Sequence, residues 1–345
     1  MTRQTTPDDV RFVERAITLA AQSPVVDPNP RVGAVIINAR GEVVGEGFHR
    51  GAGHPHAEIE ALRRAGEAAR GSTAFVSLEP CNHAGRTGPC TEALITAGVT
   101  RVVFALADPN PLAAGGADRL RAAGVQVTSG VLADEGLALN RTWVHRVRTG
   151  RPFVTWKFAA TLDGRSAAAD GTSRWITGEP ARAEVHALRA TCGAVIAGTG
   201  TVLTDDPQLT VRDAQGLTGP QPLRVVIGHR SVPGEARVLD ETAPTRLFRT
   251  HDLGQVLTEL GSLGIHHALL EGGPTLAAAF VRAGLVDEVV AYLAPALLGS
   301  GTPALGDLGI ATIGNILRLS PSSVSVVGSD VRIVAGLHRP DQEGH

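Results

Sequence analysis

Residues 54–90 read HPHAEIEALRRAGEAARGSTAFVSLEPCNHAGRTGPC, and the N-terminal half of the chain is organised around them. His56, Cys81 and Cys90 offer one imidazole nitrogen and two thiolates, a ligand set that suits Zn²⁺. Three protein ligands leave a fourth tetrahedral position for water, which is typical of a catalytic rather than a structural zinc. Glu58 is then the natural group to move protons on and off that water.

The spacing of these residues leaves alternatives open. A disulfide between Cys81 and Cys90 is the simpler interpretation, although His56 and Glu58 beside them favour a metal. His54 could be mistaken for the ligand, but the H-x-E and P-C patterns of zinc nucleobase deaminases favour His56. The cysteines here lie further apart than in that signature. A regular helix also turns about 200° between His56 and Glu58, so spacing alone does not bring both to one metal.

Length and composition narrow the class of protein. The chain has 345 residues, of which 43% are apolar and 19% are charged. This predicts a globular protein of two domains, each of roughly 100–200 residues. A formal charge of −2 and an aromatic content of 3% argue against a nucleic-acid partner. The chain has no signal-peptide pattern, no apolar run of the ~20 residues that a membrane span needs and only three cysteines, so we expect a cytoplasmic protein without a membrane partner.

Helices and strands are expected to alternate in the first half. The periodicity predicts a helix over 8–22, capped by Asp8 or Asp9, and a hairpin around residues 38–41. Strands alternating with helices imply a mainly parallel sheet with helices on its faces. The remaining helices are expected at 56–70, 91–97 and 117–123, and the remaining strands at 73–78, 101–107 and 125–131.

A basic segment, residues 134–152, joins the two halves and reads as a solvated connecting helix. Gly150 and Pro152 mark the end of this segment, because glycine and proline interrupt helices. We therefore expect a metal-binding domain over 1–149, a second domain over 150–338 and a disordered tail over 339–345.

The second half is expected to contain two glycine-rich turns. Gly198 and Gly200 follow a buried strand, but the third glycine of a dinucleotide fingerprint is missing. A second strand ends at Glu271, and Gly272 and Gly273 then lead into a helix. The N–H groups of that helix start could bind a phosphate, or the segment could be an ordinary strand-to-helix turn. Cys192 begins a strand and is most simply a small core residue.

Motifs in both halves resemble the bifunctional deaminase–reductase family of riboflavin biosynthesis. The N-terminal motifs are PNPRVGAVI, GFHRGAGHPHAE, EPCNHAGRTGPC and DPNP; the C-terminal motifs are KFAATLDGR, DGTSRWITG, VHALRA, GTVLTDDPQLTVR, EGGPTLAAAF and DEVVAYLAPALLG. The likeness covers residues 9 to about 337. It implies an α/β protein with an N-terminal cytidine-deaminase-like αβα sandwich and a C-terminal dihydrofolate-reductase-like α/β domain.

For the first domain, the resemblance implies zinc-dependent deamination of 2,5-diamino-6-(5-phosphoribosylamino)pyrimidin-4(3H)-one, with one zinc ion per chain and Glu58 as the catalytic residue. The residues that match the family's substrate pocket are Asn29, His49, His83, Arg86 and Asn110. Asn82 and Ala84 depart from the family, which has Ser and often a second His at these positions.

For the second domain, the resemblance implies NADPH-dependent reduction of the ribosyl group to ribityl. The implied cofactor contacts are Ala159, Trp175, Thr201, Asp205, Gly273, Pro274, Thr275, Leu276, Ala277, Ala278 and Ala279. The implied substrate contacts are Ser173, Arg189, Leu209, Arg212 and Glu271. Lys157 and Asp205 are the candidates to supply a proton when the sugar opens. Gly228 and His229 stand where the family usually has Asp-Ser, which bears on the adenosine end of the cofactor.

The resemblance further implies a homo-oligomer, either a dimer or a tetramer. Two other interpretations compete with the bifunctional enzyme. One is a monofunctional nucleoside or nucleotide deaminase whose C-terminal half serves only assembly. The other is a zinc-stabilised scaffold module, although a structural zinc is normally closed by four protein ligands.

Overall fold

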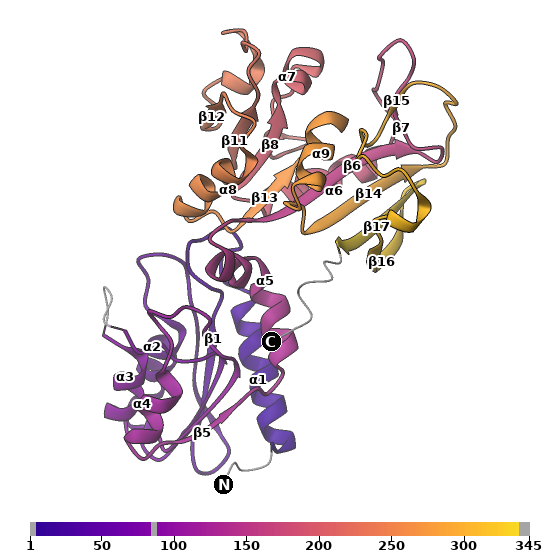
Figure 1. The fold of residues 1–345 in the computed structure, drawn as a ribbon. Helices are drawn as coiled ribbons and strands as arrows, with labels where there is room; N and C mark the ends of the chain where they lie inside the picture. The colour runs from indigo at the N-terminus through magenta and orange to yellow at the C-terminus, as the bar shows by residue number, and fades with distance from the viewer. Residues whose placement is uncertain (1–4, 84–87, 338–345) are drawn as a thin grey trace. The chain divides into compact units, whose positions relative to one another are not determined.

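The computed structural model of the chain describes residues 5–83 and 88–337. The chain divides into two compact units, Met1–Gly150 and Arg151–His345 (Figure 1). Arg86 and the tail expected at 339–345 lie outside the described residues.

A five-stranded sheet with the order β2-β1-β3-β4-β5 forms the centre of the first unit. β1 pairs antiparallel with β2 and with β3, whereas β3, β4 and β5 run parallel to one another. The predicted hairpin of β1 and β2 is confirmed. The expectation of a mainly parallel sheet is wrong for β1 and β3, which pair antiparallel because the hairpin reverses the chain before α2 leads it into β3. The strands are β1 Gly33–Ile37, β2 Val43–Phe48, β3 Thr73–Leu78, β4 Arg101–Leu106 and β5 Gln126–Ser129.

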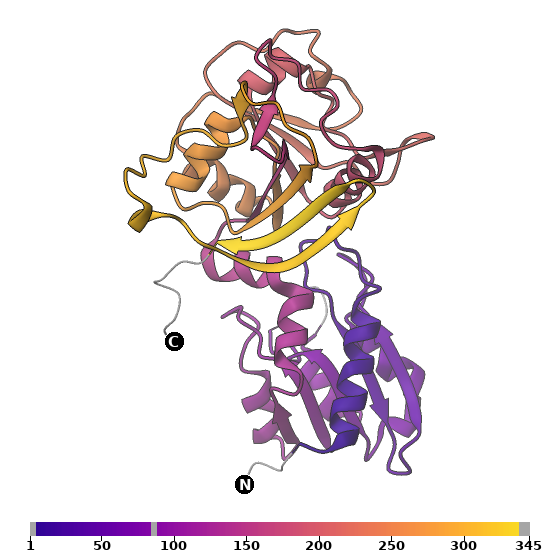
Figure 2. The same ribbon diagram turned by 90° about the vertical axis from the view of Figure 1, so that its right-hand side faces the viewer.

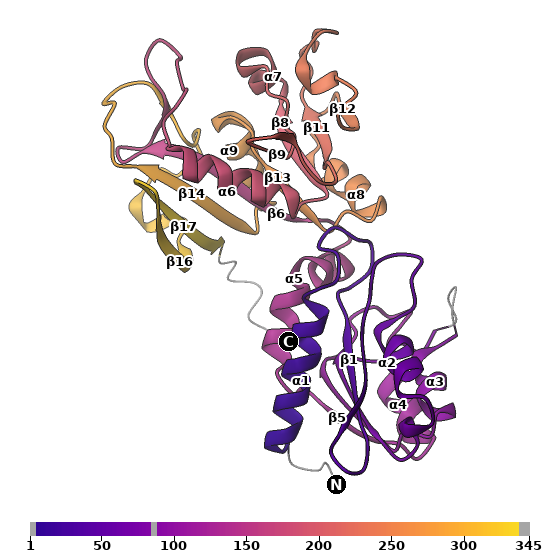
Figure 3. The same ribbon diagram turned by 180° about the vertical axis from the view of Figure 1, so that it is seen from behind.

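Helices cover both faces of this sheet because its central strands are apolar on both sides. Ala34 and Ile36 of β1 pack in one cluster with α2, and the alternate side chains of Val35 and Ile37 pack with α1. Figures 1 and 3 show α2, α3 and α4 on one side of the sheet and α1 and α5 on the other. The helices are α1 Pro7–Ala20, α2 Ala57–Ala65, α3 Cys90–Thr96, α4 Gly116–Ala122 and α5 Ala133–Thr149, with a 3₁₀ turn at Gly66–Ala69.

Two helix starts differ from the sequence expectation. Thr6, not Asp8 or Asp9, caps α1; its hydroxyl accepts from the backbone N–H of Asp9, and the Asp9 carboxylate accepts from the Thr6 N–H in return. α2 begins at Ala57, so His56 is its N-cap residue with an extended backbone (φ −69°, ψ 160°). His56 is thus outside the helical turn that the sequence expectation had assumed.

The second unit is built on an eight-stranded sheet with the order β12-β11-β8-β13-β6-β14-β17-β16. Its strands from β12 to β14 run parallel, and β17 and β16 complete it as an antiparallel pair at one edge (Figure 2). The main strands are β6 Phe153–Thr161, β8 Ala194–Gly198, β11 Leu223–Ile227, β12 Thr245–Phe248, β13 His267–Leu270, β14 Glu288–Ala294, β16 Leu319–Val327 and β17 Asp330–Leu337. Two short ribbons pair β7 Arg165–Ala167 with β15 Thr302–Pro303, and β9 Arg212–Asp213 with β10 Gly216–Leu217.

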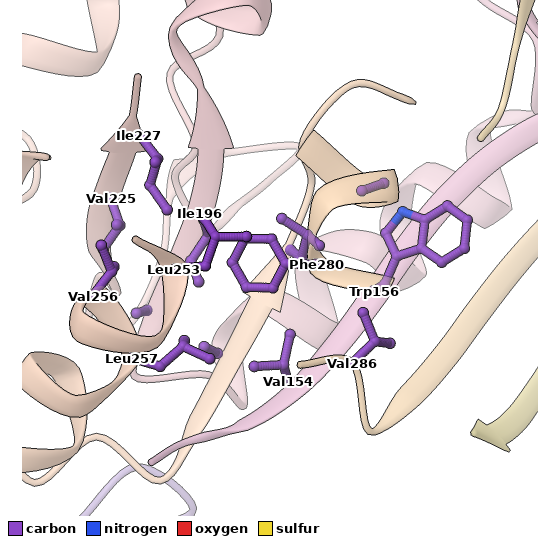
Figure 4. Packing of buried hydrophobic residues seen from close by; sticks show 14 of the residues in the cluster. Val154, Trp156, Ile196, Val225, Ile227, Leu253, Val256, Leu257, Phe280 and Val286 are labelled. Atoms are coloured by element: carbon purple, nitrogen blue, oxygen red, sulfur yellow. The ribbon is translucent and has the colours of Figure 1, made fainter. Parts of the chain in front are cut away.

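The core of this unit lies between the parallel strands and two helices. Phe280 of α9 and Leu257 of α8 are fully buried in one cluster with Ile196 of β8 (Figure 4). Burying three such side chains stabilises the fold by roughly 1.5–3 kcal/mol each. The opposite face packs against α6, whose Ala181 and Val185 are buried. The helices are α6 Glu179–Ala190, α7 Thr199–Asp205, α8 Leu253–Ser262 and α9 Pro274–Arg282, with 3₁₀ turns at Arg237–Leu239 and Ile313–Asn315.

The chain after β8 forms a short helix, α7, where the sequence predicted a glycine turn. In the ranges that the structure describes, no helix is both long and apolar enough to cross a membrane.

Candidate active sites

The first site lies where the N-terminal ends of α2 and α3 meet the end of β3. His56 Nδ1 lies 3.3 Å from Cys90 Sγ and 3.6 Å from Cys81 Sγ. All three atoms lie within 4.8 Å of one another, and among the described residues no other group of three His, Cys, Asp or Glu side chains comes together in this way. The structure thus brings together the three predicted ligands.

This arrangement fits a zinc ion. Zn–N and Zn–S bonds of about 2.0 and 2.3 Å at tetrahedral angles place the ligand atoms about 3.6 Å apart. The two nitrogen–sulfur distances are close to this value. Both sulfur atoms face Nδ1 of the imidazole, which identifies Nδ1 as the ligand atom. A disulfide is excluded, since Cys81 and Cys90 are both free thiols.

The helix start at Cys90 prepares the thiols for a metal. The backbone N–H of Cys90, the first residue of α3, points to the Cys81 sulfur at 3.5 Å. Hydrogen bonding with Cys90 is the main cause that lowers the pKa of Cys81 to about 4, and His56 contributes to the same shift. The site therefore favours a thiolate at Cys81, the form that binds metals.

Glu58 is buried beside this ligand set, in the first turn of α2. Burial raises the pKa of its carboxyl group to about 7, and the charge of Cys81 adds to the effect. The angular argument against Glu58 does not apply, because His56 lies before the helix with an extended backbone. A carboxyl group that titrates near neutral pH is suited to accept and return protons.

Buried His49 and half-buried Asn29 lie next to the ligands. His49 donates from Nδ1 to the carbonyl oxygen of Pro55 (3.1 Å), which leaves Nε2 to accept from the Asn29 amide (3.2 Å). The His49 ring packs edge-on against His56 with centroids 5.6 Å apart. Burial lowers the pKa of His49, which favours the neutral imidazole. Both residues thus lie close to the ligand set, as the sequence predicted.

The loop after β4 closes another side of this site. Ala113 packs with Cys81 and Cys90, and its carbonyl oxygen accepts from the backbone N–H of Asn82 (3.0 Å). Asn110 belongs to this loop and is half-buried. His83 is exposed and lies two residues after Cys81 in the chain. Arg86 lies outside the described residues.

Two acidic residues that the sequence interpretation missed hold this loop. The Glu79 carboxylate is buried and accepts from the N–H groups of Asp108 (3.2 Å) and Ala117 (2.8 Å). Burial raises the pKa of Asp108 to about 6, and the nearby Glu79 and Cys81 charges contribute. Glu79 directly precedes the P-C motif and Asp108 begins the DPNP motif, but neither residue was given a role from the sequence.

The second site is a cavity of about 980 Å³ in the C-terminal unit. It crosses the carboxyl ends of the parallel strands, the place where open α/β sheets bind nucleotides. The residues along it that the sequence predicted are Lys157, Ala159, Ser173, Thr201, Asp205, Glu271, Gly273, Pro274, Thr275, Leu276 and Ala279.

The start of α9 gives this cavity a phosphate-binding element. α9 follows β13 through Gly272 and Gly273, and its N-cap residue Gly273 offers no side chain to the helix N–H groups. The Gly273 N–H is held by the Thr201 hydroxyl at 3.1 Å. The uncapped N–H groups and the helix dipole favour an anion here. These features fit the pyrophosphate of a dinucleotide such as NADPH.

A buried ion pair lies at one end of the cavity. Arg189 donates two hydrogen bonds to the Glu271 carboxylate, at 2.5 and 2.9 Å. Burial lowers the pKa of Lys157, with Glu271 opposing and Arg189 adding to that shift. The Arg189 guanidinium also donates to the carbonyl oxygen of Thr210 (2.9 Å). Glu271 and Thr210 thus hold the Arg189 guanidinium in one position beside the cavity.

Several predicted contacts do not line the cavity. Trp175 is 67% exposed and lies under the Arg182 guanidinium. Leu209 is buried with a left-handed backbone, and Arg212 is half-buried. Ala277 and Ala278 are buried on the inner face of α9. The residues absent from the lining are Trp175, Arg189, Leu209, Arg212, Ala277 and Ala278.

The cavity also contains residues that the sequence interpretation missed. Arg230 and His251 line its end near β11 and β12, together with His229, which was noted only as a departure from the family. Arg282 of α9 lines it as well. None of these positions belongs to a motif, so their convergence follows only from the sheet topology.

Comparisons with known proteins agree with this two-site architecture. Residues 6–106 match the cytidine and deoxycytidylate deaminase zinc-binding region, and residues 152–333 match the RibD C-terminal domain. The chain is 51% identical over 331 residues to riboflavin biosynthesis protein RibD of Mycobacterium tuberculosis, a match over 94% of this chain and 97% of the relative. It is 44% identical to RibD of Escherichia coli over 94% and 98% of the two chains.

Solved structures show the same overall likeness. RibD of Acinetobacter baumannii superposes with a TM-score of 0.87 at 40% identity, over 96% of this chain and 99% of that one. A diaminohydroxyphosphoribosylaminopyrimidine deaminase/5-amino-6-(5-phosphoribosylamino)uracil reductase from Thermotoga maritima gives a TM-score of 0.85 at 33% identity, with the same coverage. The chain belongs to the RibD family of riboflavin biosynthesis enzymes, with a zinc-binding deaminase domain followed by a reductase domain.

Proposed function

We propose that the first unit deaminates 2,5-diamino-6-(5-phosphoribosylamino)pyrimidin-4(3H)-one to 5-amino-6-(5-phosphoribosylamino)uracil. The second unit then reduces the ribosyl group of this product to ribityl with NADPH. The name of the Thermotoga maritima relative contains both activities. The observation that carries the proposal is that one chain holds both the His56–Cys81–Cys90 ligand set and the strand-end cavity.

In the first step, the chain's own residues hold the metal and move one proton. A zinc ion held by His56, Cys81 and Cys90 supplies the Lewis acidity that makes water a nucleophile near neutral pH. Glu58 takes a proton as the water oxygen bonds to the amino-bearing ring carbon. The same carboxyl group then gives that proton to the amino group, the C–N bond breaks and ammonia leaves. Glu58 is buried beside the ligand set in the first turn of α2, in position for both transfers.

Asn29, His49, His83, Arg86 and Asn110 are proposed to bind the substrate. The support for Asn29 and His49 is their partly buried hydrogen bond beside the ligand set. The support for Asn110 is its place in the loop that packs on Cys81.

In the second step, NADPH would supply the hydride to C1′ when bound in the cavity. Lys157 would give a proton to the ribose ring oxygen as the C1′–O4′ bond breaks. Burial lowers the pKa of Lys157, so the proton leaves it more readily than from an exposed lysine. Lys157 lines the cavity beside Glu271, and we place it ahead of Asp205 as the donor for this reason.

Glu271 and Arg189 are the charged residues beside Lys157, and their ion pair fixes the position of both charges relative to its ammonium group. Arg212 is proposed to bind the 5′-phosphate, because within residues 5–83 and 88–337 no carboxylate pairs with its guanidinium. A guanidinium binds phosphate through two hydrogen bonds. Ser173 and Leu209 remain proposed substrate contacts, and Ala159, Trp175, Thr201, Asp205 and residues 273–279 remain proposed cofactor contacts.

The experiment that tests this step is NADPH oxidation after addition of the deaminated compound. Wild type is expected to oxidise NADPH, and Lys157→Met is expected to lower kcat by about 10²–10⁴-fold, the usual contribution of a general acid. No oxidation by wild type would contradict the reductase assignment. Unchanged kcat in the variant would contradict the role of Lys157.

The two alternatives are disfavoured. A deaminase with an inert assembly domain does not account for the match of residues 152–333 to the RibD C-terminal domain. A scaffold module does not account for an open three-ligand site with a buried carboxyl group beside it. We further propose that the enzyme works in the cytoplasm. We also propose that it forms a homo-oligomer, and light scattering after size-exclusion chromatography tests this oligomeric state.

A further inference from the structure

We propose that Asp163 is a positioning residue for the reductase step. Its carboxylate fixes a strap, residues 296–306, over the part of the cavity that takes the nicotinamide half of NADPH. The inference rests on the proposed reductase function, and it concerns a residue that does not itself line the cavity. The strap follows β14, includes β15 and reaches the start of α9.

The strap crosses the cavity between two fixed points. At one point, the Ala304 N–H donates to the carbonyl oxygen of Gly164 in the turn after β6 (3.0 Å), and Ala304 lines the cavity. At the other, the Gly306 N–H donates to the carbonyl oxygen of Pro274, the first residue of α9 (3.2 Å). A dinucleotide with its pyrophosphate at α9 and its nicotinamide near Lys157 of β6 would therefore pass under the strap.

Apolar burial does not hold the first half of the strap. Residues 296–300 are all exposed, and Leu297 exposes 74% of its surface. Hydrogen bonds hold this half instead. The Asp163 carboxylate accepts from the backbone N–H groups of Leu298 (3.2 Å) and Gly299 (2.7 Å). Asp163 thus ties an otherwise exposed segment to the turn after β6.

The β7–β15 ribbon brings the strap to the cavity wall (Figure 1). A Cβ on Gly301, which has φ +121°, would lie 2.2 Å from the carbonyl oxygen of Ala167, so the strap packs directly on β7. The Ser166 hydroxyl donates to the carbonyl oxygen of Pro303 (3.1 Å). Ser166, Ala167 and Thr302 all line the cavity. The position of the strap therefore sets the shape of the cavity here.

Both oxygens of the Asp163 carboxylate are in use. Oδ1 accepts from the Thr161 hydroxyl (2.6 Å) and the Leu298 N–H, and Oδ2 accepts from the Gly299 N–H. The hydrogen bonds from Thr161 and Gly299 lower the pKa of Asp163 to about 2, so the carboxylate is charged at neutral pH. An asparagine has one acceptor oxygen, and its NH₂ group would face an N–H donor. Asp163→Asn therefore breaks at least one of these bonds.

The test is calorimetric titration of the full-length protein with NADPH and with adenosine 2′,5′-bisphosphate, a fragment that lacks the nicotinamide half. In Asp163→Asn the affinity for NADPH is expected to fall about tenfold, because the strap must be ordered without one charge-assisted hydrogen bond. The affinity for the fragment is expected to stay unchanged. An equal loss for both ligands, which a general disturbance of the fold would cause, or an unchanged affinity for NADPH, would overturn the inference.

Hydrogen exchange of the protein without ligand measures the same contact. The N–H groups of Leu298 and Gly299 are expected to exchange about tenfold faster in Asp163→Asn than in wild type. Ser166→Ala removes the hydroxyl bond to Pro303 on the other side of the ribbon, and it is expected to weaken binding of NADPH but not of the fragment. Unchanged exchange in Asp163→Asn would contradict the role of Asp163.

The matched control is Asp307→Asn. Asp307 is exposed just after the strap, and its carboxylate accepts from the Gly309 N–H (2.8 Å) within its own turn. The amide oxygen of asparagine can accept the same bond, so this variant removes one charge without moving the strap. It is expected to keep the wild-type affinity for both ligands. A loss of NADPH affinity equal to that in Asp163→Asn would overturn the inference.

Enzyme assays on the same proteins separate this inference from the proposed function. In Asp163→Asn, KM for NADPH is expected to rise about tenfold, with ammonia release by the first unit unchanged. Absence of NADPH oxidation in wild type would contradict the reductase function itself. NADPH oxidation with the same KM in wild type and Asp163→Asn would contradict only the role of Asp163.

Discussion

His56 Nδ1 and Cys90 Sγ lie 3.3 Å apart although 34 residues separate them in the chain. His56 is the N-cap residue of α2, and Cys90 is the first residue of α3. The distance therefore depends on how these two helices pack on the sheet. Zinc binding is therefore a direct test of how α2 and α3 pack on the sheet.

Replacement of one thiol is expected to abolish zinc binding. In Cys90→Ser a hydroxyl, a poor zinc ligand, replaces a thiolate. We expect the zinc content, measured by mass spectrometry of the metal, to fall from about one per chain to near zero, because only two of three ligands remain. Ammonia release from the diaminopyrimidine should stop, while reduction of the deaminated compound continues.

The matched control is Cys192→Ser. Cys192 is a buried free thiol in the other unit, where it donates to the Leu188 carbonyl oxygen. This variant is expected to retain zinc. A Cys90→Ser protein with wild-type zinc content would contradict the ligand assignment.

Glu58→Gln is expected to separate chemistry from metal binding. The amide has nearly the same shape but cannot accept and return the proton. Ammonia release should fall by about 10²–10⁴-fold, with zinc content unchanged. Glu60→Gln is the control, since Glu60 lies on the same helix and pairs with Arg63. Survival of activity, or loss of zinc, in Glu58→Gln would rule out the assigned role.

The close approach of β2 to α2 is expected to position this site. A Cβ on Gly47 would lie 2.4 Å from the carbonyl oxygen of Ala57, the residue between His56 and Glu58. Gly47→Ala must therefore displace α2. We expect a loss of about 1–3 kcal/mol in the free energy of unfolding, as for other overpacked cores, together with weaker zinc binding.

The control for this variant is Gly336→Ala. A Cβ at Gly336 meets no atom within 4 Å, so the same substitution should leave zinc affinity unchanged. Equal zinc affinity of Gly47→Ala and wild type, measured by competition with a chelator, would show that α2 is not held by this contact.

The zinc ligands could be predicted from the sequence because their types and order carry the chemistry. The position of Glu58 could not, since the argument from helix angles assumed that His56 is helical. His56 has an extended backbone, and only the structure shows this. The hairpin of β1 and β2 was predicted, but the antiparallel pairing of β1 with β3 was not, because hydrophobic alternation gives the faces of a strand but not its partners.

The C-terminal site was harder to predict because its contacts are long-range. Arg189 and Glu271 are separated by 82 residues, and the ion pair between these two proposed substrate contacts was not predicted. His229 and His251 converge only because β11 and β12 are neighbours in the sheet. Ala277 and Ala278 face the core, a property that the helix start alone did not reveal.

The Arg189–Glu271 pair predicts a pH-dependent stability. Burial alone would raise the pKa of Glu271, but the charge and hydrogen bonds of Arg189 lower it to about 2, from an ordinary 4.5. The folded-state pKa is thus depressed, so the pair stabilises the protein above pH 4.5 and loses this contribution as the pH falls toward 2. Urea denaturation should show the decline in this range.

Glu271→Gln is expected to lower the free energy of unfolding by roughly 3–5 kcal/mol at pH 7, because Arg189 is left buried and unpaired. The difference from wild type should shrink as the pH falls from 4.5 toward 2, because the Glu271 carboxyl group takes up a proton near pH 4.5 in unfolded wild type but only near pH 2 in folded wild type. A difference that stays constant down to pH 2 would show that the pair does not stabilise the fold.

A double variant separates stability from activity. Arg189→Met combined with Glu271→Met replaces the ion pair with apolar side chains and should recover most of the lost stability. Reduction of the deaminated compound should be lost in this double variant, since the charges around Lys157 are gone. Recovery of both stability and NADPH oxidation would exclude Glu271 from the reductase site.

The central claim, that one chain performs both steps, is tested most directly by mass spectrometry of the products from the diaminopyrimidine substrate. Without NADPH, the account predicts a single product in which oxygen has replaced one NH. With NADPH, it predicts a second product heavier by two hydrogen atoms. An unchanged substrate in both reactions, or a deaminated product that gains no hydrogen with NADPH present, would contradict the account.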